Sequence, residues 1–186
     1  MNGVGNNGYT VLKENLTNQQ ITKIRKDLTV KPFVNASFGV EAVPFAIYME
    51  SKRKLYLPRY YGIREFGYPS SFKINKGTDI DIEFKGTLKD KQLPIVKAFV
   101  EATKDKYIGG GIISVPCGYG KTVLGLYFAS MLKLKTLVIV HKEFLMNQWK
   151  ERIEQFIPDA KVGRIQRKNI ITEDCDIVIG LLQSIS

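Results

Sequence analysis

The sequence has few cysteines, few carboxylates and no long apolar run. Its two cysteines, Cys117 and Cys175, have neither the spacing of a metal site nor the density of a disulfide framework. The N-terminus lacks the basic start and apolar stretch of a secretory signal, and no apolar run approaches membrane-spanning length. These absences predict a soluble, intracellular protein without a membrane partner, and they do not separate nucleus, cytoplasm and virion.

The shortage of acidic residues leaves the chain strongly basic. Lys and Arg number 28 and Asp and Glu number 18, which gives a net charge of +10 and a pI near 9.5. Residues 1–87 hold 13 basic and 8 acidic residues, and residues 88–186 hold 15 and 10. This net charge predicts a polyanionic partner, nucleic acid first, and the basic residues are spread over both parts and not held in a tail; a generically basic soluble protein is the alternative.

The first part of the chain, residues 1–86, is expected to be a small α+β module. Residues 1–8 are rich in Gly and Asn, which predicts a disordered start. Thr17 is expected to begin a helix, with Gln20 as its capping-box partner. Alternating apolar residues predict three strands, and a polar turn joins the first two into a hairpin. The predicted strands are residues 45–50, 55–57 and 80–84.

The second part, residues 87–186, alternates apolar strands with amphipathic helices. This order predicts an α/β fold with a parallel sheet and right-handed crossovers. Thr87 is expected to cap the first helix. The strands are expected at residues 111–115, 136–140, 162–165 and 177–180, and the other helices at 121–132 and 143–156. At 186 residues and 44% hydrophobic content, the chain has room for both modules with packed cores.

The most informative motif lies between the first of these strands and its helix, at Val115-Pro116-Cys117-Gly118-Tyr119-Gly120-Lys121-Thr122. A glycine loop in this context is typical of a phosphate-binding loop. Gly118 and Gly120 let successive backbone N–H groups turn inward, and the helix N-terminus adds partial positive charge. Lys121 is expected to reach the terminal phosphates, and the Thr122 hydroxyl to complete the shell of Mg²⁺.

Two other interpretations of this loop remain open. The loop could be a Gly-rich helix entry with a solvated lysine. It could also belong to a P-loop kinase or GTPase, although the strict motif has glycine where Val115 stands.

The motif resembles motif I of superfamily 2 helicases, whose usual form is Pro-Thr-Gly-x-Gly-Lys-Thr without the first glycine. Pro116 followed by Cys117 resembles the branch that contains the xeroderma pigmentosum group B helicase and helicases of large DNA viruses. The resemblance implies a partial RecA-like P-loop domain that binds ATP and Mg²⁺. The nucleotide contacts it implies are Gln92, Pro116, Cys117, Gly118, Tyr119, Gly120, Lys121, Thr122 and Val123. Lys121 and Thr122 are the catalytic residues among them, and Thr122 is the metal ligand.

Gln92 enters this set because Leu88-Lys89-Asp90-Lys91-Gln92 resembles the Leu-Arg-x-x-Gln segment of those helicases. A glutamine amide can both donate to and accept from an adenine edge. The alternative is a surface glutamine at a helix start.

Later segments resemble the strand-contacting motifs of the same helicases. His141 and Lys142 follow a predicted strand, where ligands of open parallel sheets collect. Arg164 and Gln183 lie in segments similar to motifs Ib and Ic, although Leu181 replaces the usual threonine. The four residues are expected to contact a nucleic-acid backbone, DNA first; a hydrogen-bonded loop residue is the alternative for His141.

The resemblance implies an ATP-dependent helicase or translocase, with remaining helicase domains and transcription or repair machinery as partners. Its Asp-Glu-x-His box and second-domain arginines are not found here, since no Asp-Glu pair occurs in the sequence. The acidic pair would hold Mg²⁺ and orient water. The chain is therefore expected to be the N-terminal part of such a motor. Residues 87–186 are expected to form an incomplete first RecA-like domain. The alternative is an ATPase-inactive nucleic-acid-binding fragment.

Overall fold

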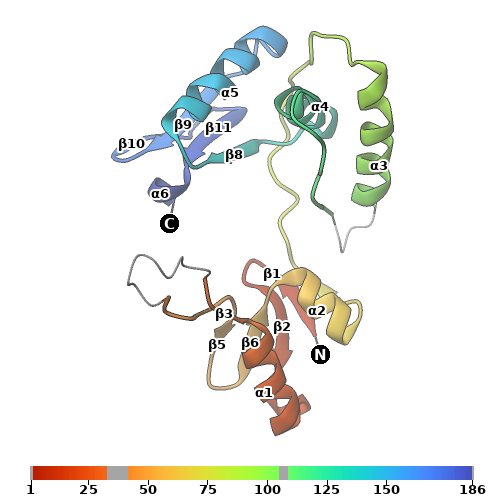
Figure 1. Cartoon of the computed structure of the whole chain (residues 1–186), viewed down its shortest axis with the longest axis vertical. Coiled ribbons are helices and arrows are strands. Elements are labelled where there is room, and N and C mark those ends of the chain that lie inside the picture. Colours follow the sequence, from red (N-terminus) through yellow and green to blue (C-terminus); the bar gives the residue numbers. More distant parts are fainter. Residues whose placement is uncertain (1, 33–41, 105–108, 186) are drawn as a thin grey trace. The chain divides into compact units, whose positions relative to one another are not determined.

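The structure is a computed structural model that describes residues 2–32, 42–104 and 109–185. The chain forms two compact units, one of residues 1–75 with 105–109 and one of residues 76–104 with 110–186 (Figure 1). The units divide after Asn75, whereas the sequence places the module boundary at Gly86. The two-module organisation at Gly86 stays a prediction.

The first unit is built on a sheet with the strand order β5-β6-β2-β1-β7. Its strands are β1 Gly3–Gly5, β2 Gly8–Leu12, β5 Met49–Glu50, β6 Lys54–Leu57 and β7 Ser71–Phe72, and a separate pair is β3 Thr29–Val30 with β4 Phe45–Ala46. Its helices are η1 Lys13–Asn15, α1 Asn18–Asp27 and α2 Arg59–Phe66. All pairs in the sheet are antiparallel except β1 with β7.

Both α-helices of this unit pack on one face of the sheet. Ile24 and Leu28 from the α1 segment lie in one core cluster with sheet residues such as Tyr9. The Tyr9 ring also stacks on Phe66 of α2, with ring centroids 6.2 Å apart. Gly62 of α2 permits this close approach, because a Cβ there would lie 2.2 Å from the Tyr9 ring. The opposite face of the sheet has no such cluster among the described residues.

The expected capping box of this unit is confirmed, whereas the expectations for its start and for residues 80–84 are wrong. Thr17 caps α1 with Gln20 as its capping-box partner, as predicted. The predicted disordered start is wrong, because residues 3–5 and 8–12 pair as a hairpin around Asn6-Asn7. Gly8, with φ of 91°, supplies the turn geometry that the Gly/Asn composition favours. Residues 80–84 form no strand in this unit; Ile82 is buried in the core of the second unit.

The second unit has the predicted α/β architecture. Its sheet has the order β10-β9-β11-β8, in which β11 pairs in parallel with both β9 and β8. The strands are β8 Thr136–Val140, β9 Val162–Gln166, β10 Asn169–Ile171 and β11 Ile177–Leu181. The helices are η3 Asp90–Gln92, α3 Leu93–Lys104, α4 Lys121–Leu132, α5 Glu143–Phe156 and α6 Leu182–Ile185. The bounds of α4, β8 and α5 are those predicted, and the antiparallel β10 was not predicted.

One face of this sheet carries the core. Residues of α4 and α5, among them Leu126 and Ile153, pack with Ile177 and Ile179 of β11. The single Trp149 lies against Gly125 of α4, where an added Cβ would be 2.9 Å from the indole. This packing fixes the start of α4, and with it the glycine loop, beside α5.

The predicted strand at residues 111–115 does not form. No described residue pairs with this segment, and the Ile112 side chain is 96% exposed. Its apolar residues favour a strand, but a strand needs a neighbour whose N–H and C=O groups can pair with it. The predicted cap at Thr87 is also wrong, since the Gln92 side chain caps the backbone N–H of Lys89 instead.

Candidate nucleotide and nucleic-acid sites

The glycine loop has the backbone geometry that an anion nest requires. Gly118 and Gly120 both have left-handed backbone, with φ of 79° and 76°. Gly120 is the N-cap of α4 and offers no side-chain cap, so the first N–H groups of α4 lack side-chain acceptors. A helix of 12 residues thus presents unpaired donors and a positive dipole end beside the loop.

Gln92 ties this loop to the segment before α3. Its side chain is only 3% exposed; Oε1 accepts from the Lys89 N–H at 2.8 Å, and Nε2 donates to the Tyr119 carbonyl at 2.9 Å. The alternative of a surface glutamine is therefore wrong. Because an amide has two donors and two lone pairs, Gln92 keeps one of each for a ligand. Its contact with an adenine stays a prediction.

The two residues expected to be catalytic lie at the start of α4. The exposed Lys121 folds back over the loop, and its Nζ donates to the Pro116 carbonyl at 2.9 Å. The half-buried Thr122 hydroxyl has no hydrogen-bond partner among the described residues. Lys121 can therefore exchange one carbonyl acceptor for phosphate oxygens, and the Thr122 oxygen remains available to a cation.

The loop opens on a cleft of about 820 Å³. Four residues at helical spacing on α5 form part of its wall: Leu145, Gln148, Arg152 and Phe156. The sequence reasoning missed these, because their apolar members fit the core face of an amphipathic helix. The other lining residues are Thr87, Lys89, Gln92, Cys117, Gly118, Tyr119, Gly120, Lys121, Thr122 and Val123. No carboxylate is among the lining residues.

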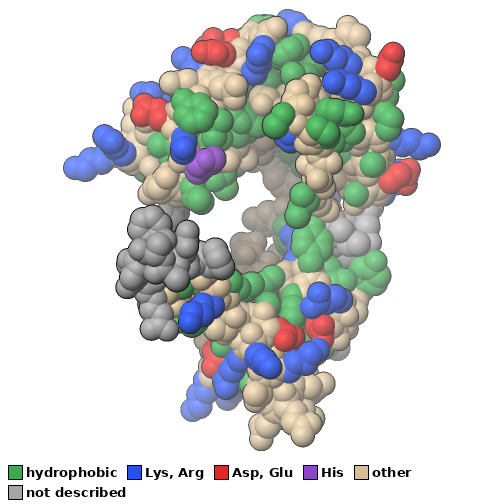
Figure 2. Space-filling view, in the orientation of Figure 1, with side chains coloured by type: hydrophobic (Ala, Val, Ile, Leu, Met, Phe, Trp, Pro, Cys, Tyr) green, Lys and Arg blue, Asp and Glu red, His purple; other side chains and the backbone are tan. Residues whose placement is uncertain are grey.

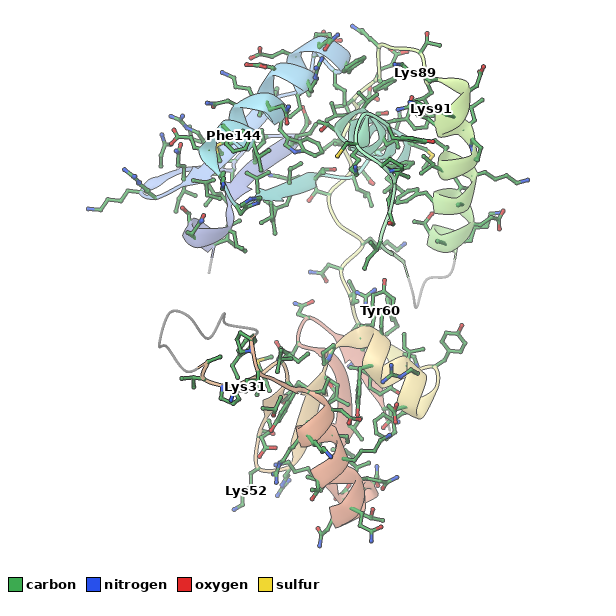
Figure 3. The ribbon with its side chains drawn as sticks, in the orientation of Figure 1. Lys31, Lys52, Tyr60, Lys89, Lys91 and Phe144 are labelled. Carbon is green, nitrogen blue, oxygen red and sulfur yellow. The ribbon has the colours of Figure 1, made fainter. Side chains whose placement is uncertain are left out.

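Tyr119 has a second contact that orders the loop. The Lys91 Nζ lies 4.3 Å from the centroid of the Tyr119 ring, which is a cation–π geometry. Lys91 and the cleft-lining Lys89 come from the same short segment before α3 (Figure 3). Two lysines therefore lie close to the loop in addition to Lys121, which makes this region suited to an anionic ligand.

Three of the four predicted nucleic-acid residues meet at the carboxyl ends of β8 and β11. His141, Lys142 and Gln183 line one depression of about 550 Å³, and the Gln183 Nε2 donates to the His141 carbonyl at 3.0 Å. His141 is exposed at the surface, where it is the purple side chain in Figure 2. The remaining lining residues are Glu143, Arg167, Leu181 and Ser184.

The structure separates Arg164 from this group and adds Arg167. Arg164 lies in the middle of β9, opposite Ile179, and does not line the depression. Arg167 lies in the β9–β10 turn with φ of 53°, and its N–H donates to the Ser184 Oγ at 2.8 Å. The polar run Gln166-Arg167-Lys168-Asn169 between Ile165 and Ile170 was the turn signal that could have found it.

The described residues show no further metal or membrane feature. No group of three His, Cys, Asp or Glu side chains that could hold a metal ion occurs in this part of the chain. Its helices are also too short or too polar to cross a membrane. Cys117 is exposed and Cys175 is buried, and both are free thiols.

Comparison of the sequence with known proteins assigns the chain to a family. Residues 85–186, more than half of the chain, match the family described as "Type III restriction enzyme, res subunit". The chain is 33% identical to the "Putative ATP-dependent RNA helicase L396" of Acanthamoeba polyphaga mimivirus over 184 residues, which is 96% of this chain and 35% of that protein.

Two further relatives match shorter stretches. One is the "Putative helicase 161L" of Invertebrate iridescent virus 6, 40% identical over 82 residues, or 44% of this chain and 18% of the relative. Another is the "General transcription and DNA repair factor IIH helicase/translocase subunit XPB" of Encephalitozoon cuniculi, 34% identical over 99 residues, or 48% and 15%. The chain thus spans about a third of the mimivirus protein's length and less of the other two. The chain belongs to the restriction-subunit-type helicase family of superfamily 2, on the XPB-like branch that includes helicases of large DNA viruses.

Proposed function

We propose that this chain is the nucleotide-binding part of an ATP-dependent helicase or translocase and that ATP binds in the cleft beside the glycine loop. The observation that carries this proposal is the loop itself: two left-handed glycines lead into a helix whose first N–H groups have no side-chain acceptor. Backbone N–H groups at a helix N-terminus and a neighbouring lysine ammonium are both groups that bind phosphate oxygens.

Each loop residue then has a defined task. Lys121 leaves the Pro116 carbonyl and pairs with the terminal phosphates, while the backbone from Cys117 to Gly120 follows the phosphate chain. Gln92 uses its remaining N–H and lone pair on the adenine and keeps the loop in place through the Tyr119 carbonyl. Pro116 and Val123 bound the loop at its two ends.

Mg²⁺ fits this site through Thr122, whose hydroxyl lines the cleft without a partner in the described part of the chain. When bound, Mg²⁺ would neutralise charge on the phosphates. Since no carboxylate lines the cleft, the groups that orient water are expected to come from elsewhere in the motor. We therefore propose that residues 87–186 act as the first RecA-like domain, after an α+β module of residues 1–86, and that remaining helicase domains complete the site.

Nucleic acid is proposed to bind at the carboxyl ends of β8 and β11. Lys142 and Arg167 supply positive charge there, and His141 and Gln183 supply hydrogen-bonding groups on the same depression. Such contacts suit a phosphate backbone read without sequence preference. Arg164 would contact the strand separately, from the middle of β9. DNA is the proposed substrate, and the transcription and repair role in the name of the Encephalitozoon cuniculi relative suggests such machinery as a partner.

Nucleotide binding by the 186-residue chain tests the proposal. Titration with a fluorescent ATP analogue should saturate, and Lys121→Ala should weaken binding about 10- to 100-fold, because a charged hydrogen bond contributes about 1.5–3 kcal/mol. Lys142→Ala removes the same charge from the other depression and is the matched control, with no change expected. Equal affinity of wild type and Lys121→Ala would reject the assignment of the loop.

A second candidate function is favoured by the carboxylate-free cleft: the chain by itself binds nucleic acid without hydrolysing ATP. Titration of DNA at several salt concentrations, with and without ATP, separates the two functions. Tight, steeply salt-dependent binding that is indifferent to ATP supports the second, whereas ATP-dependent affinity supports a motor.

A further inference from the structure

The five-stranded sheet of the first unit has two very different faces. On one face, five strand residues are each at most 2% exposed and pack with α1 and α2. These residues are Val4, Tyr9, Val11, Leu55 and Leu57. Because side chains alternate along a strand, their neighbours in sequence must point to the other side of the sheet.

That other side, here called the open face, consists of half-buried and exposed residues in the described part of the chain. Its central row runs through Met49, Tyr56, Thr10, Gly3 and Ser71, which lie directly opposite one another on five successive strands. The rest of the open face consists of Gly5, Gly8, Leu12, Lys54 and Lys73. None of these residues is buried. Three of its positions are glycines, which have no side chain, so a flat ligand can approach the sheet backbone there.

The open face carries charge of only one sign. Lys54 and Lys73 line the same depression, of about 370 Å³, and no carboxylate lines it. Neither lysine has an ion-pair partner among the described residues. The nearest acidic strand residue, Glu50, pairs in register with the buried Leu55 and therefore points to the helix side, where Arg25 holds it at 2.9 Å. Both lysines are thus available to an anion.

An aromatic hollow lies beside the charged depression. Tyr56 lines a second depression of about 240 Å³ together with Gly8 and Met49 of the open face. Thr10, directly opposite Tyr56 on the neighbouring strand, lines the charged depression. Adjacent strands are separated by about 4.8 Å, so a base in the hollow would leave its phosphate close to the lysines.

We propose that the open face binds single-stranded nucleic acid, with phosphates at Lys54 and Lys73 and a base against Tyr56. A positive groove that tracks the backbone, together with an aromatic side chain that stacks a base, is the combination that single strands require. A duplex would keep its bases paired and could not use Tyr56. Residues 1–75 hold eleven Lys and Arg and five Asp and Glu. This positive charge favours a polyanion as the ligand over a protein partner that has few acidic residues. This site is separate from the proposed nucleic-acid depression at β8 and β11 and does not depend on ATP.

Photocrosslinking of the intact chain locates the site. Single-stranded DNA or RNA that carries iodouracil is irradiated with the protein in the absence of ATP, and the tryptic peptides are mapped. Crosslinks are expected on the peptide of residues 55–59, which trypsin releases by cutting after Lys54 and Arg59. Crosslinks confined to peptides of residues 110–186 would overturn the proposal, and would leave the proposed ATP site unaffected.

Affinity measurements on charge variants give the second test. The double variant Lys54→Glu/Lys73→Glu should bind single strands at least about 10-fold more weakly, and its salt slope should fall by about 1.4 for two lost phosphate contacts. The matched control is Lys26→Glu/Lys97→Glu, which changes the same charge at exposed positions on α1 and α3. Equal losses in both double variants, or an equal loss of duplex binding, would overturn the proposal.

The aromatic contact is tested with a conservative pair. Tyr56→Ala should weaken single-strand binding about 5-fold or more, as expected for the loss of one stacked base. Tyr56→Phe keeps the ring and should retain wild-type affinity. Thermal unfolding of both variants shows whether the sheet is intact. A folded Tyr56→Ala variant with wild-type affinity would contradict the stacking role.

Discussion

The two glycines of the phosphate loop should differ in their tolerance of a methyl group. Gly118 and Gly120 have nearly the same left-handed φ, 79° and 76°. Their surroundings differ, because a Cβ on Gly118 meets nothing within 4 Å, whereas one on Gly120 would lie 2.8 Å from the Gln92 Nε2. The pair Gly118→Ala and Gly120→Ala therefore separates backbone strain from the contact between loop and Gln92.

The expected magnitudes follow from these two terms. Left-handed backbone costs a non-glycine residue about 1–2 kcal/mol, and this is the whole expected cost of Gly118→Ala. Gly120→Ala should additionally displace the Gln92 amide from the Tyr119 carbonyl, which adds about 0.5–1.5 kcal/mol for the lost hydrogen bond. The free energy of unfolding should therefore fall by roughly 1.5–3.5 kcal/mol in Gly120→Ala.

Urea unfolding followed by tryptophan fluorescence measures both variants in the relevant unit. The chain has one tryptophan, Trp149, which packs on α4 in the second unit, so its signal reports the unfolding of that unit. Gly120→Ala should also weaken ATP binding more than Gly118→Ala does. Equal losses of stability in the two variants, or a larger loss in Gly118→Ala, would refute the argument that Gln92 holds the loop.

Two further predictions concern α5 and the first unit. Arg152 lies on the cleft wall and is exposed, so Arg152→Ala should weaken ATP binding several-fold without destabilising the fold. Fluorescence titration measures the affinity and thermal unfolding the stability. Unchanged affinity would show that α5 is not part of the site. Burial, together with the hydrogen bond to Asp27, raises the pKa of Tyr61 to about 12. The folded pKa exceeds the unfolded value of 10.0, so protonated Tyr61 contributes to the free energy of unfolding. This contribution is complete below pH 10 and is lost as pH rises towards 12. In an NMR titration of the tyrosine rings, Asp27→Ala should lower the Tyr61 pKa, and an unchanged value would contradict the role of Asp27.

Local signals predicted the elements around the site well. The apolar composition of α4, the apolar strand β8 and the apolar periodicity of α5 were sufficient, because each element is specified by its own residues. The capping box at Thr17 is equally local, and it is present. His141 and Lys142 line one depression with Gln183 because the strand ends of a parallel sheet share one edge, and their contact with nucleic acid stays a prediction.

The features that sequence reasoning missed depend on partners distant in the chain. Residues 111–115 have strand composition, but no described strand pairs with them. The burial of Gln92 depends on its hydrogen bond to the Tyr119 carbonyl, which lies 27 residues further along the chain, and no local pattern indicates it. Arg152 reaches the cleft because α5 packs against α4, so its role follows from tertiary packing. The Gly/Asn start was misjudged because composition alone does not separate a hairpin turn from disorder.

The loop from Pro116 to Thr122 is proposed to hold the phosphates of a nucleotide. Isothermal titration of the chain with ATP, ADP and adenosine in the presence of Mg²⁺ tests it most directly. Since charged hydrogen bonds contribute about 1.5–3 kcal/mol each, affinity should fall by about tenfold or more as phosphates are removed, and adenosine should bind very weakly. Equal affinity for ATP and adenosine would contradict the account.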